Sequence, residues 1–412
     1  TTSSGEPGQN ASDFYIRGIG TFGGRATPLI MLDGVEISAS DLNYIPAESI
    51  ESFSILKDAS ATAIYGARGA NGVMLVTTKV GKENEKTRVN ASVENSFNMP
   101  MSFPDFVDGV TYMKMFNEAI YTRSGSYAGL PYTDEYIANT QNGKNPYVYP
   151  NVNWKDLMFK DMSMSQRANV NIQGGGSKAN YYLSLQVNHD TGVLNTQKLY
   201  SFDNNINVWG YTFQSNVDYK LTPTTKVGLR MNAQMRNTTG PNKSTSELFG
   251  NMLNANPVTF PAFYPNSADV AGSDHMLFGN RYRSGELTYI NPYAEMLSTY
   301  KEYLESTVLA TVDFEQQLDF ITKGLKLKGL VSFKNWSTSS FNRTIEPYFY
   351  APTEGSYDKY DPTAQGYTLE RVGTSGTDYV VQSNPSKDGD RTFQFQASLE
   401  LSLIHISEPT RH

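Results

Sequence analysis

Histidine and cysteine, which often take part in catalysis and metal binding, are rare or absent in this chain. The few histidines are not close together in the sequence. The four histidines are His189, His275, His405 and His412, and cysteine is absent. Without cysteine there is no disulfide, no thiolate nucleophile and no cysteine-ligated metal centre. A histidine-based zinc site needs two histidines a few residues apart, a spacing that this sequence lacks. We therefore predict neither a metal site nor a bound cofactor.

Asp313 and Glu315 are the acidic pair best placed for acid–base catalysis. They lie two residues apart in a segment of alternating polarity, so both side chains face the same side of a strand. A glycosidase needs two carboxyl groups about 5 to 9.5 Å apart across a sugar, and this spacing does not exclude one. Charged residues facing water are the simpler interpretation, and the sequence contains no G-x-S-x-G nucleophile motif. We predict that the chain is not an enzyme.

The segment from Gly18 to Gly23 matches the G-x-G-x-x-G pattern of dinucleotide-binding loops. Such a loop binds pyrophosphate only where a strand precedes it and a helix starts within it. Here a Gly-Gly pair, Pro28 and an apolar strand follow, so no helix N-terminus is available. The pattern indicates a tight turn rather than a nucleotide site.

Composition narrows the partners and the fold. The net charge is −7 and no long basic run is present, which argues against a nucleic-acid partner. Aromatic residues make up 12% of the chain, with 27 Tyr and 33 Gly, a mixture typical of many short strands joined by turns. No apolar run reaches the roughly 20 residues of a membrane-spanning helix. The chain opens at Thr1 without a recognisable signal peptide.

The first eighty residues predict a compact unit of strands and one short helix. Asp33-Gly34 joins two apolar runs within Pro28–Ser38, and Asp-Gly in this position is typical of a two-residue hairpin turn. The other predicted elements are a strand at Ile50–Leu56, a helix at Ala59–Tyr65 capped by Asp58 and ended by Gly66, and a strand at Val73–Lys79.

Beyond Lys86 the dominant pattern is strict alternation of apolar and polar residues, which is typical of β-strands with two different faces. About eight segments show it. They are Arg88–Phe97, Ala168–Gln173, Tyr181–Asn188, Tyr211–Tyr219, Val227–Met235, Thr307–Glu315, Leu325–Lys334 and Phe393–Leu401. A soluble β-sandwich would also alternate, so this pattern alone does not decide the fold.

The connections between these segments alternate strictly between long and short. Long connections span residues 98–164, 190–208, 237–304 and 338–390, whereas short turns span residues 174–178, 221–224 and 321–324. Outer-membrane barrels have short periplasmic turns and long extracellular loops, while compact soluble domains rarely repeat such long loops. The polar face also carries charge on successive strands, as at Asp218, Arg230 and Lys326, which predicts a wet barrel interior.

Three stretches of the N-terminal unit, residues 16–18, 28–35 and 50–79, resemble the second half of the plug domain of TonB-dependent outer-membrane transporters. Lys57-Asp58-Ala59 followed by Tyr65–Gly72 is similar to the SusC/RagA-like branch in particular. The residues that match the plug motifs are Arg17, Gly18, Asp33, Gly34, Lys57, Asp58, Tyr65, Gly66, Arg68, Gly69, Asn71 and Gly72. The resemblance implies that they maintain the plug's shape and its contacts with the barrel.

The resemblance also implies a fold and a function. The expected fold is an α+β plug domain followed by an incomplete antiparallel transmembrane β-barrel, with about eight of the roughly 22 strands that plugged barrels use. The expected function is TonB-dependent import of an oligosaccharide or a peptide across the Gram-negative outer membrane, with the plug gating the barrel. The implied partners are the TonB complex, a SusD-like surface lipoprotein and outer-membrane lipid.

We divide the chain into a partial plug at residues 1–82, barrel strands with long loops at residues 83–402, and a non-native tail at residues 403–412. The tail abandons the alternation and introduces Pro409, as translated adapter sequence would. Eight strands enclose only their own side chains, too little space for a plug. We therefore expect the chain to be a fragment that does not fold alone.

Two questions stay open at this point. The alternative function is a non-transporting surface β-barrel that acts as an adhesin or binding protein. The long loops are rich in aromatic residues, among them Tyr127, Tyr149, Phe260, Tyr264 and Tyr350. Such rings stack on sugars or on a partner in one interpretation, and pack the loops against one another in the other.

Overall fold

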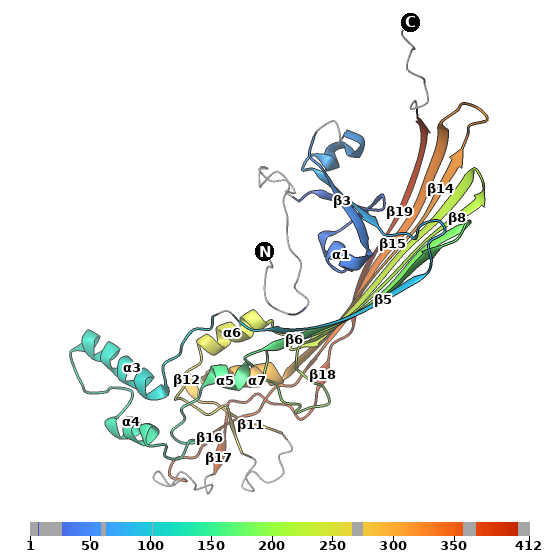
Figure 1. Ribbon diagram of the computed structural model, residues 1–412. Helices are drawn as coiled ribbons and strands as arrows, with labels where there is room; N and C mark the ends of the chain where they lie inside the picture. The colour runs from blue at the N-terminus through green and yellow to red at the C-terminus, as the bar shows by residue number, and fades with distance from the viewer. Residues whose placement is uncertain are drawn as a thin grey trace.

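The structure is a computed structural model that describes Pro7 and residues 27–58, 63–100, 102–265, 275–356 and 368–402. Figure 1 shows three parts: a small N-terminal domain, a long antiparallel sheet, and a group of helices, short strands and loops at one end of that sheet. The N-terminal domain lies against one face of the sheet.

The N-terminal domain contains the predicted hairpin, made of β1 (Leu29–Leu32) and β2 (Val35–Ile37). Its two turn residues have positive φ angles, 48° at Asp33 and 87° at Gly34, as a type I′ turn requires. The predicted Asp-Gly turn is confirmed.

Two more strands complete a four-stranded sheet in the N-terminal domain. β4 (Val73–Thr78) pairs parallel with β1 and antiparallel with β3 (Ile50–Leu56), which gives the strand order β2-β1-β4-β3. Both strands agree with the predicted segments. Between β2 and β3 the chain forms helix α1 (Ala39–Asn43) and a 3-10 turn, η1 (Ala47–Ser49).

The helix predicted at residues 59–65 can be compared with the structure only at its end, because residues 59–62 lie outside the described residues. The structure has 3-10 turns over η2 (Ala63–Gly69), interrupted at Gly66. Gly66 has non-helical angles, φ 59° and ψ −147°. The turn before it therefore ends at Gly66 as predicted, because a glycine adopts positive φ readily, and the turn that follows was not predicted.

All eight alternating segments form long strands of one sheet, which we call the wall. The strands are β5 (Arg88–Asn98), β6 (Ser163–Gly175), β7 (Ala179–Thr191), β8 (Asn207–Thr222), β9 (Thr225–Gly240), β14 (Thr299–Gln317), β15 (Leu325–Thr344) and β19 (Ser386–Leu401). Each pairs antiparallel with the next in this order. Among the described residues β5 and β19 do not pair with each other, so the wall is an open sheet.

Most strands extend beyond the alternating segments at the end that carries the long loops. β15, for example, runs to Thr344, whereas its predicted segment ends at Lys334. The extension is rich in Ser, Thr and Asn. Alternation therefore marks only the part of a strand that has one apolar face, and backbone pairing continues past it.

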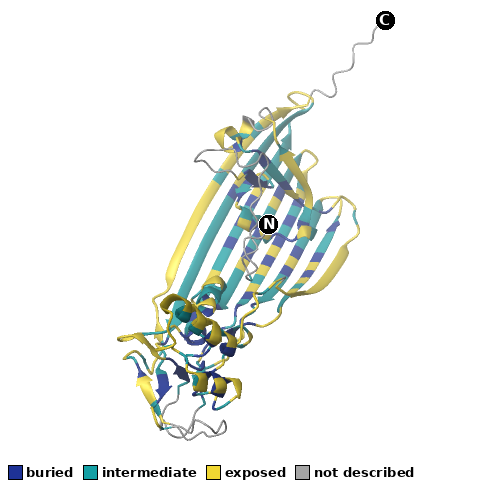
Figure 2. Ribbon diagram, turned by 90° about the vertical axis from the view of Figure 1, so that its left-hand side faces the viewer, coloured by how far each residue is buried: buried dark blue, intermediate teal, exposed yellow. Residues whose placement is uncertain are grey.

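The two faces of the wall show the opposite of the burial pattern of a soluble protein, in which the apolar face of a sheet is the buried one. The face toward the N-terminal domain is polar and, in the central strands, buried: Asn216 is 0% and Gln214 1% exposed. The opposite face exposes large apolar side chains, such as Val93 at 83% and Phe395 at 73%. Figure 2 shows buried positions alternating along the central strands, with both edge strands exposed. The predicted wet interior is thus wrong for the central strands, because the N-terminal domain covers them.

The connections follow the predicted alternation. Short turns lie at one end of the wall, and the long connections gather at the other end (Figure 1). The elements within the long connections are α3 (Gly109–Ser124), α4 (Asp134–Gln141), α5 (Trp154–Met158), α6 (Thr245–Leu253), α7 (Pro292–Leu297), β10 (Phe263–Tyr264), β11 (Leu277–Gly279), β12 (Tyr282–Ser284), β13 (Leu287–Thr288), β16 (Phe349–Pro352), β17 (Leu369–Val372) and β18 (Val381–Gln382). No helix in the described part of the chain is both long and apolar enough to cross a membrane.

These elements, which we call the loop body, have an apolar core of their own around Trp154, Phe260 and Tyr293. Most of the aromatic residues noted in the sequence serve such packing: Tyr149, Phe260, Tyr264 and Tyr350 are each at most 6% exposed. Tyr127 differs, because it is 72% exposed and stacks only on its neighbour Tyr121.

Candidate functional site

The N-terminal domain contacts the wall through a small apolar centre surrounded by polar contacts. Its core residues Ile30, Leu32 and Val76 pack with Leu309 and Leu330, which project from the polar face of the wall. Leu309 is 6% exposed. Two leucines on an otherwise polar face are the sequence signal of this contact, and alternation alone did not reveal its meaning.

Four side-chain amides form a continuous ladder across the polar face of β8 and β9. Gln234 Nε2 donates to Asn232 Oδ1 (2.8 Å), Asn232 Nδ2 to Gln214 Oε1 (2.9 Å), and Gln214 Nε2 to Asn216 Oδ1 (3.2 Å). Each member is at most 9% exposed. An amide both donates and accepts, so a row of amides satisfies its own members and still has donors for the N-terminal domain.

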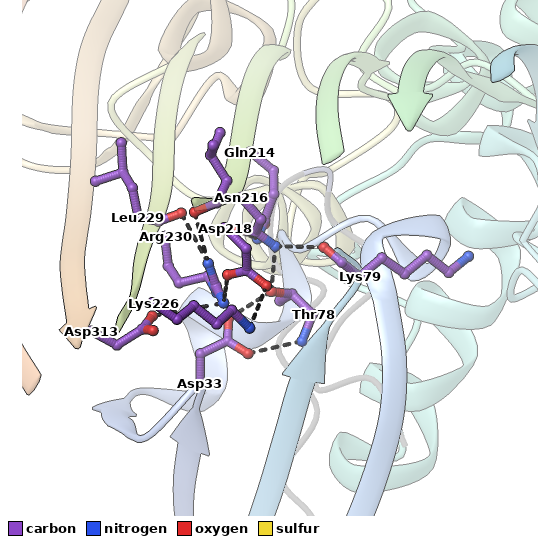
Figure 3. A network of polar contacts seen from close by, with 11 residues as sticks. Asp33, Thr78, Lys79, Gln214, Asn216, Asp218, Lys226, Leu229, Arg230 and Asp313 are labelled. Carbon is purple, nitrogen blue, oxygen red and sulfur yellow. Dashed lines mark hydrogen bonds and ion pairs between the residues drawn. The ribbon is translucent and has the colours of Figure 1, made fainter. Parts of the chain in front are cut away.

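The first end of the ladder meets the end of β4. Asn216 Nδ2 donates to Thr78 Oγ1 (2.6 Å) and to the Lys79 carbonyl (2.7 Å), as Figure 3 shows. Thr78 in turn donates from its backbone N–H to Asp33 Oδ1 (2.9 Å) and from its hydroxyl to Asp33 Oδ2 (2.6 Å). Burial raises the pKa of Asp33, although these two hydrogen bonds and the charge of Arg230 act in the opposite direction. We call this contact the Asp33 anchor.

A cluster of charges on the wall lies beside the Asp33 anchor (Figure 3). Arg230 contacts Asp218 at 2.5 Å and Asp313 at 3.7 Å, and Lys226 contacts Asp218 at 2.8 Å. Asp313 pairs in register with Gly228, where a Cβ atom would lie only 2.3 Å from the carboxylate. A side chain at Gly228 would therefore displace the Asp313 carboxylate from its present position beside Arg230.

The other end of the ladder meets helix α1. Gln234 Nε2 donates to the Asp41 carbonyl (3.1 Å), and the Asp41 carboxylate pairs with Lys334 of β15 (2.6 Å). The same carboxylate accepts hydrogen bonds from the backbone N–H and hydroxyl of Ser38 in a capping box. Burial opposes ionisation, but Lys334 and Ser38 together hold the pKa of Asp41 below its ordinary value. We call this contact the Asp41 anchor.

Two tyrosines strengthen the contact on either side. Thr212 Oγ1 donates to the Tyr44 carbonyl (3.1 Å), and the guanidinium of Arg236 lies 4.9 Å from the centre of the Tyr44 ring. Tyr182 of β7, which is 1% exposed, donates to the Glu48 carbonyl (3.2 Å) and lies 3.1 Å from Ser49 Oγ. Tyr182 is a further large residue on the polar face whose role was not predicted from the sequence.

Among the predicted site residues, Gly34 contacts the wall directly, and Asp33 is linked to it through Thr78, which accepts a hydrogen bond from Asn216 of the wall. The Gly34 carbonyl accepts a hydrogen bond from Gln394 Nε2 (3.2 Å), and a Cβ atom at Gly34 would lie 3.3 Å from Leu330. Asp33 therefore forms the hairpin turn and also ties that turn to Thr78 at the end of β4, which the motif alone did not distinguish.

The remaining predicted site residues lie elsewhere. Tyr65 packs against the core formed by Leu29, Met31 and Val73, and Arg68 forms an exposed ion pair with Glu36. The other described residues of the motif lie in the turns between β3 and β4: Lys57, Asp58, Gly66, Gly69, Asn71 and Gly72. Arg17 and Gly18 lie outside the described residues.

The acidic residues do not form a catalytic pair. Glu315 pairs with Lys326 at 3.0 Å, and Asp313 faces Arg230, so each carboxylate has its own cation. Within the described ranges no group of three or more His, Cys, Asp or Glu side chains is arranged to hold a metal ion. The side chains of this site hold the N-terminal domain against the polar face of the wall.

A domain of strands and helices lies on the polar face of an antiparallel sheet, and the apolar face of that sheet is exposed. This arrangement agrees with the plug and barrel strands expected from the resemblance to TonB-dependent outer-membrane receptors. The family model of the TonB-dependent receptor plug domain matches residues 1–73. The chain is 34% identical over 235 residues to TonB-dependent receptor P26 of Formosa agariphila, a match that covers 56% of this chain and 21% of that protein.

Two further matches are to SusC and to RagAB. The chain is 29% identical over 227 residues to TonB-dependent receptor SusC of Bacteroides thetaiotaomicron, covering 53% of this chain and 20% of SusC. The structure of the RagAB peptide transporter shares the fold, with a TM-score of 0.61 at 17% identity over 94% of this chain and 49% of that chain. The plug-domain match, these relatives and the shared fold together support a SusC/RagA-like TonB-dependent receptor. Its matches span about a fifth of the length of these curated relatives. The N-terminal domain is called the plug below.

Proposed function

We propose that this chain is part of a TonB-dependent importer that carries a nutrient, an oligosaccharide or a peptide, across the outer membrane of a Gram-negative bacterium. The observation that carries the proposal is the inverted wall: its polar face is covered by the plug, and its apolar face is exposed. Lipid would solvate the apolar face, as in transmembrane β-barrels, and the plug would block the polar interior until transport occurs.

The contact between plug and wall suits a part that has to move. It consists mainly of hydrogen bonds and ion pairs around the small apolar centre of Leu309 and Leu330. A hydrogen bond exchanged for one with water contributes only about 0.5–1.5 kcal/mol net. The plug is therefore held by many small contributions that water replaces as it shifts, and force transmitted by TonB would displace it without breaking a large apolar interface.

The two expected protein partners would act at opposite ends of the molecule. We infer that TonB acts from the side of the short turns, and that a SusD-like surface lipoprotein covers the side of the loop body. The loop body has its own apolar core, so it presents a formed surface to such a partner. The same feature supports the alternative function, a surface adhesin or binding protein that transports nothing.

The test is a double substitution in the full-length receptor, Asp33→Ala with Gly34→Ala. The first change removes the acceptor of both Thr78 hydrogen bonds, and the second places a Cβ at φ 87°. We expect lower uptake of labelled oligosaccharides or peptides, or sensitivity to antibiotics too large for an intact barrier. Glu51→Ala on exposed β3 is the control.

Two results would contradict the proposal. Equal uptake in cells with and without TonB would exclude TonB-dependent transport. Normal uptake together with an intact permeability barrier in the double variant would show that the Asp33 anchor does not hold the plug. Absence of any uptake by the unaltered receptor would favour the adhesin.

A further inference from the structure

The apolar face of the wall has a defined edge on β15 and β19, on the side of the loop body. Phe393 of β19 pairs in register with Phe333 of β15, and the centroids of their rings lie 5.0 Å apart. The next residue on the same face of β19 is Arg391, whose partner in register is Asn335. Aromatic residues border the apolar band of transmembrane barrels. The aromatic pair therefore marks the edge of the band, and polar side chains begin directly beyond it.

Three cations lie on this face of the wall, at the edge of the band and beyond it. Arg391 is exposed, and its Nε donates to Asn335 Oδ1 at 3.1 Å. Lys387 is also exposed and lies four residues closer to the loop body, about 13 Å away at a rise of roughly 3.3 Å per residue. Arg343, near the end of β15, donates from Nε to Gln382 Oε1 at 3.1 Å. Neutral amides thus orient both guanidinium groups without neutralising their charge.

Among the residues that the structure describes, none of these three cations lies within ion-pair distance of a carboxylate. The cations at the Asp41 anchor and in the charge cluster beside the Asp33 anchor, by contrast, are all paired. Asp388 and Asp390 alternate with the two β19 cations and therefore project to the polar face. Glu302, on the apolar face of β14, accepts a hydrogen bond from the Tyr300 hydroxyl at 3.2 Å. The three positive charges therefore remain available to an anion outside this chain.

We propose that these cations bind the phosphate groups of an anionic membrane lipid at the loop-side edge of the apolar face. Phe393 and Phe395 on that face are 63% and 73% exposed and would contact acyl chains. This contact places the headgroup of the same lipid at the level of Arg391, where the apolar residues end. Guanidinium and ammonium groups both form charge-assisted hydrogen bonds with phosphate oxygens. The inference rests on the proposed function for the membrane position of the wall, and the lipid is a partner distinct from the cargo.

The experiment measures lipid binding to the purified full-length receptor by native mass spectrometry. The probes are lipid A, a glycolipid that carries phosphate, and the same lipid after enzymatic removal of its phosphates. We expect lipid A to bind, and the double variant Lys387→Gln with Arg391→Gln to weaken that binding about tenfold or more, because two cations near the headgroups are lost. Arg391→Lys keeps the charge and should retain most of the affinity. The dephosphorylated lipid should bind the unaltered receptor no more tightly than lipid A binds the double variant.

Lys323→Gln is the matched control, because Lys323 is an equally exposed cation in the short turn between β14 and β15, at the opposite end of the wall. It should leave lipid A binding unchanged. The proposal is overturned if the double variant binds lipid A as tightly as the unaltered receptor does, if removal of the phosphates has no effect, or if Lys323→Gln weakens binding as much as the double variant. TonB-dependent uptake, measured separately in cells, decides the import function whichever of these results is found.

Discussion

The two faces of the wall are built from the same strands and alternate residue by residue, yet they follow opposite rules. On β8, Gln214 and Asn216 are buried under the plug, whereas Phe213, next to Gln214 in the strand, is 38% exposed on the other face. Across strands the same division holds, because Phe213 pairs with Leu185 and Ala233, while Gln214 pairs with Ser184 and Asn232.

This difference between the two faces indicates the surroundings of each one. Burying amides is favourable only when every donor and acceptor finds a partner, and the ladder and the plug provide these partners. Exposing Phe213, Val93 and Phe395 is favourable only where the surroundings are apolar. Substitutions on the two faces should therefore have separate effects, and the largest is expected on the apolar face.

Phe213→Arg should destabilise the full-length receptor in lipid vesicles by about 2–4 kcal/mol, the cost of arginine at the middle of a bilayer. Phe213 lies in the central part of β8, away from both ends. Denaturant unfolding of the membrane-inserted protein measures the change, with Phe213→Leu as a control that keeps the face apolar. An unchanged midpoint for Phe213→Arg would mean that this face does not contact the bilayer core.

Asn216→Leu tests the polar face. The change leaves the Gln214 amide and the Lys79 carbonyl without their partner, and each unpaired buried group costs about 1–3 kcal/mol. We expect a looser plug, seen as faster amide hydrogen exchange in β1 and β4 and as entry of large antibiotics. Asn90→Leu is the matched control, because Asn90 lies on the same face of the wall but in exposed β5. Equal effects from both variants would show that burial under the plug is unimportant.

The two anchors should respond to pH in opposite ways. Burial raises the pKa of Asp33 above its ordinary value of 3.8. The contribution of Asp33 to plug stability is therefore fully present below pH 3.8 and is lost as pH rises through the raised pKa. The pKa of Asp41 is lowered from 3.8, so its contribution is present above that value and is lost as pH falls through the lowered pKa.

This contrast is measured as the urea midpoint of plug unfolding against pH, with a fluorophore on the plug. Acidification from pH 7 toward 3.8 should raise the midpoint in the unaltered receptor. The rise should be absent in Asp33→Asn and retained in Asp41→Asn, with a total effect smaller than that of Asn216→Leu. A rise retained in Asp33→Asn would assign it to another group.

The sequence predicted the strands of the wall because alternation is a local property of each strand. It placed Leu309 on the polar face without explaining it, since the explanation is a contact with Ile30 and Val76 of the plug more than 200 residues earlier. Arg230 was noted as a charge, but its two partners on β8 and β14 depend on the register among three strands. Such contacts follow from how the parts dock, and one sequence contains no local signal for that.

The motif residue Arg68 should have the smallest effect, although its neighbours Gly66 and Gly72 have the positive φ angles that shape the plug. Its ion pair with Glu36 is exposed, with 73% of the Arg68 side chain accessible, and exposed pairs contribute about 0–1 kcal/mol. We therefore expect Arg68→Ala to leave plug stability nearly unchanged, with Arg68→Lys as the charge-preserving control. A loss in Arg68→Ala as large as that in Asn216→Leu, restored by lysine, would mean that Arg68 holds the plug through a contact other than Glu36. Polar anchoring of the plug would then extend beyond the amide ladder and its two anchors.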